Sequence, residues 1–158
     1  MRSQPLTFMV LSVAFLAGSA LASNEKVLHT FSAGTDGSYP VAALIADQSG
    51  NLYGTTRYGG ANGQGTVFEL INSNGVWNET ILYSFAGGND GASPAASVVF
   101  GQGGNLYGTT RLGGPDNAGI VFKLAHVNGA WQESVLYSFT GGNDGGSPRP
   151  VSPLSVTR

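Results

Sequence analysis

The sequence repeats itself at a fixed distance. Asn51–Arg57 reads NLYGTTR, and the same seven letters return at Asn105–Arg111. The segments GTVFEL and GIVFKL, which begin at Gly65 and Gly119, keep the same step of 54 positions. A long fixed period within one chain is typical of proteins built from stacked structural units. The repeat therefore constrains the fold more than any other feature.

Two further segments occur three times and set the boundaries of the units. They are VLHTF, ILYSF and VLYSF, which begin at Val27, Ile81 and Val135, and the loops DGSYP, DGASP and DGGSP, which begin at Asp36, Asp90 and Asp144. We expect a repeat region over 23–148, with a leading strand and loop at 27–40, a first repeat at 41–94 and a second at 95–148. Residues 149–158 are expected to form a proline-containing tail or a truncated third repeat.

Each repeat predicts four antiparallel β-strands. In the first repeat they cover 41–47, 51–56, 66–71 and 77–85, and the second repeat places the same strands 54 positions later. Short runs of β-branched and aromatic residues between Gly, Asn, Asp, Ser and Pro indicate strands joined by turns. Asn-Gly between the last two strands of each repeat is a strong hairpin signal, because both residue types tolerate positive φ.

The second strand of each repeat carries groups that can be buried on both faces, which indicates a sheet covered on both sides. Gly54 and Gly108 lie in the middle of this strand, where glycine usually marks the close approach of another backbone or a bulky ring. We therefore predict an all-β, β-propeller-like fold of stacked four-stranded blades; a β-sandwich is the alternative. The repeated residues expected to form this structural signature are Leu52, Tyr53, Gly54, Thr55, Thr56, Trp77, Leu106, Tyr107, Gly108, Thr109, Thr110 and Trp131.

The first residues have the layout of a secretory signal peptide. Arg2 precedes an apolar run, and small residues follow as far as Ala22. This order predicts a signal peptide over 1–22, cleavage near Ala22, and a secreted or cell-surface protein without a stable membrane span; a retained anchor is the alternative. The chain has no cysteine, so disulfides cannot hold it together. Its net charge of −2 does not favour nucleic acid as a partner.

The combination LYGTT, GG, GTVFEL, W and ILYSFAGGNDGASP resembles the GloVer repeat of bacterial choice-of-anchor tandem-repeat proteins. The match is carried by 52–56, Gly59-Gly60, 65–70 and 81–94, and by their equivalents 54 positions later. The resemblance implies an exported, propeller-like repeat protein. It supplies no catalytic residue, ligand or cofactor.

Two blades cannot close a ring of the usual four to eight. Such a pair exposes sheet faces and strand edges, which favour association. Two interpretations follow. The chain is a fragment or shortened relative of a longer array, or copies of it self-associate, with the strand over 25–31 completing a neighbouring sheet.

The three repeated loops place Asp36, Asp90 and Asp144 among glycine and asparagine. We expect each carboxylate to bind backbone N–H groups of its own turn. A Ca²⁺ site made from carboxylates and backbone carbonyls is the alternative. No other metal or cofactor is expected.

The remaining polar candidates have ordinary interpretations. His29 stands where the other units have Tyr, and we interpret it as a packing substitute; His126 is a turn residue. Glu79 and Glu133 are expected to share a strand face with Trp and Tyr. These glutamates and the repeat-matched arginines at 57 and 111 could pair within or between blades, with modest benefit if exposed. Two carboxylates in equivalent environments do not suit an acid and a base, which argues against catalysis.

Tyr39 and Tyr58 lie on the loops that differ between the repeats and are candidates for ligand binding. We interpret the chain as a secreted or cell-surface, non-enzymatic β-repeat protein that acts as a structural or interaction module. The alternative is a carbohydrate-binding lectin formed by oligomerised two-blade chains. A third hypothesis is a propeller-type polysaccharide hydrolase or lyase. The sequence does not identify a glycan or protein ligand.

Overall fold

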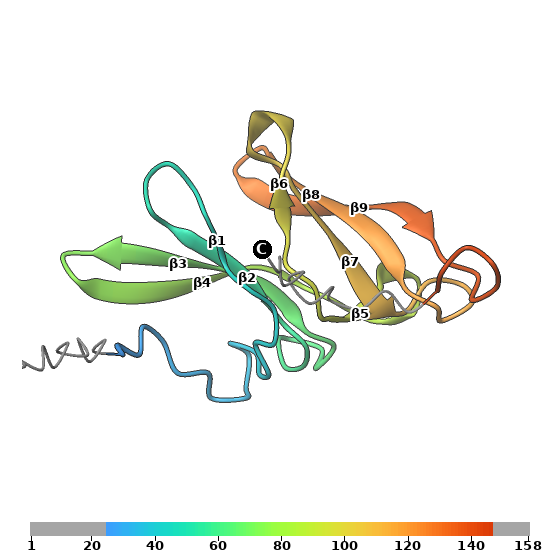
Figure 1. Ribbon diagram of the computed structural model, residues 1–158, viewed down its shortest axis with the longest axis horizontal. Helices are drawn as coiled ribbons and strands as arrows, with labels where there is room; N and C mark the ends of the chain where they lie inside the picture. The colour runs from blue at the N-terminus through green and yellow to red at the C-terminus, as the bar shows by residue number, and fades with distance from the viewer. Residues whose placement is uncertain (1–24, 147–158) are drawn as a thin grey trace, which may run out of the picture.

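The computed structural model describes residues 25–146, and these form an all-β structure with two antiparallel sheets side by side (Figure 1). The expected signal peptide over 1–22 and the tail over 149–158 lie outside the described residues. Among the described residues, no helix is long and apolar enough to cross a membrane.

The first sheet is a simple meander with the order β1-β2-β3-β4. Its strands are β1 (Ile45–Ala46), β2 (Leu52–Thr56), β3 (Thr66–Ser73) and β4 (Val76–Ser84). The Asn74-Gly75 hairpin forms as predicted, with φ of 54° and 86° at these two residues. Every strand therefore pairs with the one before it, as a blade-like unit requires.

The second sheet repeats this meander and begins with an extra strand. Its elements are β5 (Ala92–Pro94), β6 (Val99–Phe100), β7 (Leu106–Leu112), β8 (Ile120–Val127) and β9 (Ala130–Ser138), with 3₁₀ turns at η1 (Gly88–Asp90) and η2 (Gln102–Gly104). β5 and β6 both pair with β7, and β7, β8 and β9 follow in order. The Asn-Gly turn between β8 and β9 has positive φ at both residues.

Three sequence predictions about strands need correction. The first strand of each repeat was predicted over seven residues, but β1 and β6 contain two residues each. β5 was not predicted; it forms because Ala92 and Pro94 pair with the end of β7. No strand is assigned over 25–31, although its sequence resembles the ends of β4 and β9. Those ends pair with β3 and β8, whereas the described residues offer the leading segment no partner strand.

A β-bulge in β4 changes which residues share a face. Val67 pairs with Tyr83 while Phe68 pairs with Ile81, so Leu82 is the extra residue. Paired residues share a face, and the alternation of side chains changes phase at the bulge. Glu79 lies on the Phe68 side of the sheet and Tyr83 on the opposite side. The prediction that Glu79 shares a face with Tyr is therefore wrong, and β9 has the equivalent bulge.

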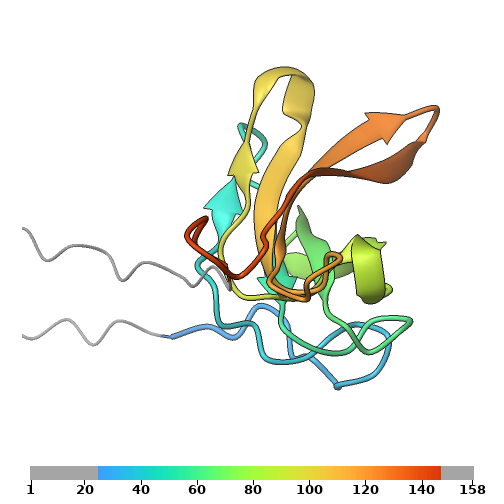
Figure 2. The ribbon, with the colours of Figure 1, turned by 90° about the vertical axis from the view of Figure 1, so that its right-hand side faces the viewer.

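The core lies where the two sheets face each other, as the two views show together (Figures 1 and 2). Phe85 follows β4 and packs edge to face on Phe122 of β8, with ring centroids 5.1 Å apart. Both phenylalanines are fully buried. On the other side of the first sheet, Phe31 makes the same kind of contact with Phe68, with centroids 5.0 Å apart. Each sheet is thus covered by the segment that precedes it.

The glycine in the middle of the second strand makes room for these rings. A Cβ at Gly54 would lie 2.6 Å from the Phe68 ring and 2.6 Å from Leu44. At Gly108, a Cβ would lie 2.5 Å from Phe122. The expectation that these glycines mark the close approach of a bulky ring is confirmed.

We expect Gly108→Ala to lower the free energy of unfolding by about 1–3 kcal/mol, because the added methyl group overpacks the core against a buried ring. Denaturant unfolding measures this change. Gly142→Ala is the control, because a Cβ there would meet only Thr140 Oγ1, at an ordinary van der Waals distance of 3.6 Å. Equal stability of the two variants would contradict the proposed packing role.

Candidate functional site

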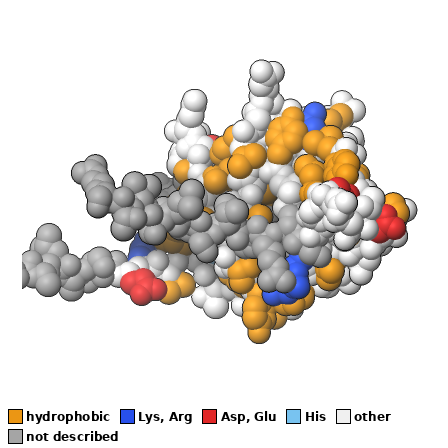
Figure 3. All heavy atoms as spheres, turned by 45° about the vertical axis from the view of Figure 1, so that its right-hand side comes forward, with side chains coloured by type: hydrophobic (Ala, Val, Ile, Leu, Met, Phe, Trp, Pro, Cys, Tyr) orange, Lys and Arg blue, Asp and Glu red, His pale blue; other side chains and the backbone are white. Residues whose placement is uncertain are grey.

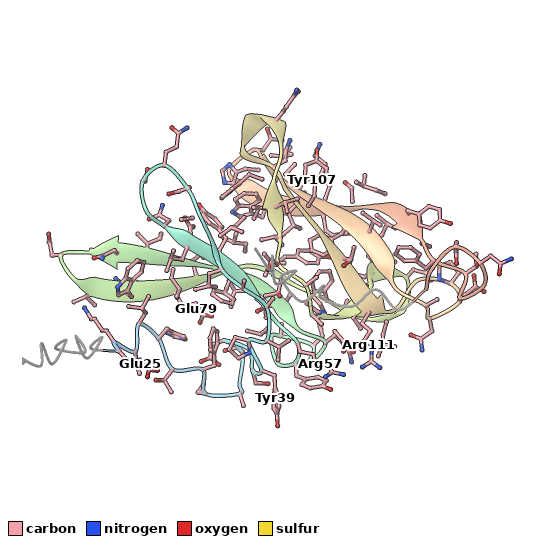
Figure 4. The ribbon with its side chains drawn as sticks, in the orientation of Figure 1. Glu25, Tyr39, Arg57, Glu79, Tyr107 and Arg111 are labelled. Atoms are coloured by element: carbon pink, nitrogen blue, oxygen red, sulfur yellow. The ribbon has the colours of Figure 1, made fainter. Side chains whose placement is uncertain are left out.

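Tyr39 and Tyr58, predicted from sequence as ligand candidates, lie next to each other. Ser38 and Tyr58 form a β-bridge, with N–H to O distances of 2.8 and 3.1 Å. The two tyrosine rings meet edge to face with centroids 5.5 Å apart. Tyr39 is 66% exposed and Tyr58 39% exposed. Figure 4 shows Tyr39 at the edge of the molecule. The role of the two tyrosines in binding stays a prediction.

Neither repeated arginine forms an ion pair among the described residues, so the charge pairing that the sequence allowed is not found there. The guanidinium carbon of Arg57 instead lies 5.1 Å from the centre of the Tyr58 ring. The Nε atoms of Arg57 and Arg111 are buried and have no hydrogen-bond partner. Figure 4 shows both side chains at the same edge of the molecule as Tyr39.

The three repeated aspartates hold their own turns. Asp36 accepts hydrogen bonds from the backbone N–H and hydroxyl of Ser32, at 2.8 and 2.9 Å. Asp90 accepts from Ala86 N–H and the Tyr83 hydroxyl. Asp144 accepts from the Tyr137 hydroxyl and from the N–H and hydroxyl of Thr140, which stand at the positions equivalent to Tyr83 and Ala86. Hydrogen bonds from the backbone lower the pKa of Asp36 and of Asp144. The turn interpretation is confirmed, and the Ca²⁺ interpretation stays a prediction.

A glutamate from the next sheet reaches each of the first two loops. Glu79 of β4 faces Asp36, and Glu133 of β9 faces Asp90. Burial, with a smaller effect of the neighbouring aspartate, raises the pKa of each glutamate to about 7. Each carboxyl also has an oxygen, Oε1, that is buried without a hydrogen-bond partner. These acidic pairs join consecutive units of the repeat.

His29 occupies the position of Tyr83 in the first of these clusters. Its ring packs edge to face on Phe31 with centroids 4.7 Å apart, as expected for a packing substitute. Its Nε2 also lies 3.5 Å from Glu79 Oε2 and 4.0 Å from Asp36 Oδ2. The sequence analysis missed this cluster because its members lie far apart in the chain. The 54-residue step aligns His29, Asp36 and Glu79 with Tyr83, Asp90 and Glu133. This alignment is the sequence signal that could have revealed the cluster.

An aromatic pocket between the sheets was also missed. Tyr53 and Phe100 meet edge to face with centroids 5.1 Å apart. The Tyr53 hydroxyl donates to Glu69 at 2.6 Å, and burial together with this acceptor raises the pKa of Tyr53. The pocket has a volume of about 420 Å³ and is lined by Ala46, Asp47, Gln48, Tyr53, Phe100, Gly104 and Trp131.

The outer faces of the two sheets are both apolar. Within residues 25–146 no segment packs over the outer face of the second sheet, and the leading segment covers that of the first sheet only in part. We call the outer face of the second sheet the C-terminal end face; it includes Tyr107, Val121, Leu136 and Tyr137. Figure 3 shows hydrophobic side chains gathered on the side of the molecule where this sheet comes forward. The N-terminal end face is a hollow of about 300 Å³ lined by Leu28, His29, Phe31, Pro40, Ala42, Leu44, Phe68 and Leu70.

The repeated sheets and loops agree with a comparison to family models. The model of the Gloeobacter/Verrucomicrobia repeat matches residues 16–155. The chain belongs to this repeat family. This match confirms the family that the sequence resemblance indicated. A search of curated proteins and a search of solved structures found no match to the chain.

We expect the stability of this repeat protein to fall as pH rises from 5 to 8. Glu133 keeps its proton in the folded state up to about pH 7, against an ordinary pKa of 4.5. The folded state therefore binds more protons than the unfolded state in this window, and the free energy of unfolding decreases with pH. Since solvent reaches one side of each carboxyl, we expect a total decrease of about 1–2 kcal/mol from Glu79 and Glu133 together.

Glu133→Gln tests this expectation, because the amide is neutral at every pH. The variant should lose about half as much stability as the parent between pH 5 and 8, measured by denaturant unfolding at each pH. Exposed Glu25→Gln is the matched control and should keep the parent slope. A Glu133→Gln slope equal to that of the parent would contradict the role of this carboxyl.

Proposed function

We propose that this protein is an exported, non-enzymatic interaction module that binds further repeats of its own kind through its end faces. The observation that carries the proposal is a difference between equivalent residues. Leu82 is 8% exposed because the second sheet covers it, whereas its equivalent Leu136 is 52% exposed. At the other end, Val98 is fully buried, whereas its equivalent Leu44 is 43% exposed. The C-terminal end face therefore has side chains equivalent to those that the first sheet turns toward the second. The N-terminal end face has side chains equivalent to those that the second sheet and its leading segment turn toward the first.

The geometry of the internal interface describes how a second copy would bind. The first sheet of the second copy would pack on the C-terminal end face as the second sheet packs on the first. Residues 135–144 of one copy would then take the place that 27–36 hold in the other. The exchange is favoured by sequence, since VLYSF and VLHTF share three of five residues and differ only by Tyr for His and Ser for Thr. Repetition of this contact gives a propeller-like ring or an open stack.

Sedimentation velocity of residues 23–158 tests the association. We expect multimers whose size depends on concentration, and monomers for Leu136→Asp and for Leu44→Asp, because each substitution places a charge in an apolar contact. Each variant keeps one intact end face. An equimolar mixture of the two should therefore form a 1:1 dimer and nothing larger.

Val76→Asp is the control for this experiment. Val76 is 61% exposed at a hairpin tip and belongs to neither end face, so its substitution should leave the multimers unchanged. A parent protein that stays monomeric at every concentration would overturn the proposal. So would multimers that survive both end-face substitutions.

Export and the absence of catalysis are part of the same proposal. Export is supported by the signal-peptide layout of residues 1–22, and intact mass after expression in a bacterial host should show a chain that begins at Ser23. The absence of catalysis is supported by the pKa of about 7 shared by Glu79 and Glu133, because an acid and a base need different values. Turnover of any polysaccharide in a panel would contradict it.

A carbohydrate-binding role is the second candidate, and the adjacent rings of Tyr39 and Tyr58 favour it. Exposed aromatic rings beside polar groups offer a face for sugar rings. A glycan array should give specific signals that Tyr58→Ala reduces by about five- to thirtyfold, as expected when a stacking contact of about one to two kcal/mol is lost. Signals of equal strength for the parent and Tyr58→Ala would contradict this role for the pair.

A further inference from the structure

The cluster of His29, Asp36 and Glu79 has the composition and spacing of a metal site. One ligand atom from each residue lies within 4.8 Å of the other two. His29 Nε2 is 3.5 Å from Glu79 Oε2 and 4.0 Å from Asp36 Oδ2. Imidazole nitrogen and carboxylate oxygen bind Zn²⁺ at about 2.0–2.2 Å, so ligand atoms around a tetrahedral ion lie about 3.4 Å apart. The His29–Glu79 distance already matches this spacing, the His29–Asp36 distance is about 0.6 Å longer, and the two carboxylates, which lie within 4.8 Å, would have to approach each other by up to about 1.4 Å.

Two of the three side chains, Glu79 and His29, present atoms at this point that have no hydrogen-bond partner. The Glu79 side chain is only 8% exposed, and its Oε1 is buried without a hydrogen bond. His29 Nε2 is also buried without a hydrogen bond. Among the described residues, no lysine or arginine forms an ion pair with Asp36 or Glu79. Two carboxyl groups and a free imidazole nitrogen are therefore held together without a balancing cation.

The surroundings hold the three side chains in place and leave access to solvent. Phe31 packs on the His29 ring, and Ser32 donates two hydrogen bonds to Asp36. Such contacts orient metal ligands in known sites. Figure 4 shows Glu79 pointing from β4 toward the leading segment that carries His29. Asp36 and Glu79 also line an open pocket of about 380 Å³, together with Thr35, Ala61, Ile81 and Ser84, so water can supply a fourth ligand.

The next unit provides a natural comparison. Tyr83, Asp90 and Glu133 occupy the equivalent positions, and there the Tyr83 hydroxyl donates a hydrogen bond to Asp90. That donor satisfies the aspartate directly. In the first cluster, the imidazole nitrogen replaces the hydroxyl and makes no such bond. The two clusters therefore differ in a single ligand-forming residue.

We propose that His29, Asp36 and Glu79 bind one divalent transition-metal ion of the zinc class, with water as the fourth ligand. The mixed nitrogen and oxygen donors suit Zn²⁺ or Co²⁺ better than Ca²⁺, which prefers six to eight oxygen ligands. The ion ties the leading segment to β4 of the first sheet. It leaves the second unit without metal.

Calorimetric titration of residues 23–158 with Zn²⁺ tests this site. The protein carries His126→Asn, the residue of the equivalent position 72, so that the only other histidine cannot contribute. We expect one Zn²⁺ per chain and a rise of the melting temperature in its presence. Co²⁺ in place of Zn²⁺ should give the visible absorption of a tetrahedral ion.

Two substitutions exchange the histidine of the first cluster and the tyrosine of the second, so each introduces a residue that the repeat already has at this position. His29→Tyr should abolish binding while the chain stays folded, since Tyr stands at both equivalent positions. Tyr83→His should create a second site and raise the stoichiometry to two. Ca²⁺ added alone should leave the melting temperature unchanged. The proposal is overturned if Zn²⁺ does not bind, or if His29→Tyr binds Zn²⁺ as tightly as the parent, in which case His29 and Glu79 form only an ion pair.

Discussion

The edge-to-face contact between Phe85 and Phe122 is the interaction on which the rest of the structure depends. Phe85 ends one repeat, and Phe122 lies in the middle of the next. A single repeat unit cannot bury its hydrophobic face alone, so each unit needs its neighbour to be stable. The same contact occurs between Phe31 and Phe68. Stability therefore comes from the junctions between units, as in other repeat proteins.

The junctions also explain the polar residues that the repeats retain. Each loop aspartate ties down the turn that leads from one unit into the next, and each glutamate approaches the same loop from the following sheet. A buried, unpartnered carboxyl costs free energy unless it is protonated or finds a cation. The first cluster has His29 at this point and the second has Tyr83. One junction can thus acquire a chemical property that the other lacks, without a change in the fold.

Sequence reasoning found the features that depend on the repeat and on local geometry. The Asn-Gly hairpins, the order of the strands and the reason for Gly54 and Gly108 all follow from short segments. It failed where distant partners decide the outcome. The segment over 25–31 has the composition of a strand, yet pairing needs a neighbour. The bulge at Leu82 changes the faces of β4 where the residues on both sides are apolar, so simple alternation gave the wrong side for Tyr83.

The hairpin ends have a consequence for how such an array can diversify. A side chain added at Gly75 or at Gly129 would meet no atom within 4 Å. Both turns lie at the same position of successive units, at the ends of the β3–β4 and β8–β9 hairpins and outside the core. Longer peptides inserted there would be displayed at regular intervals on an unchanged scaffold. The array can therefore vary what it presents to its surroundings independently of what keeps it folded.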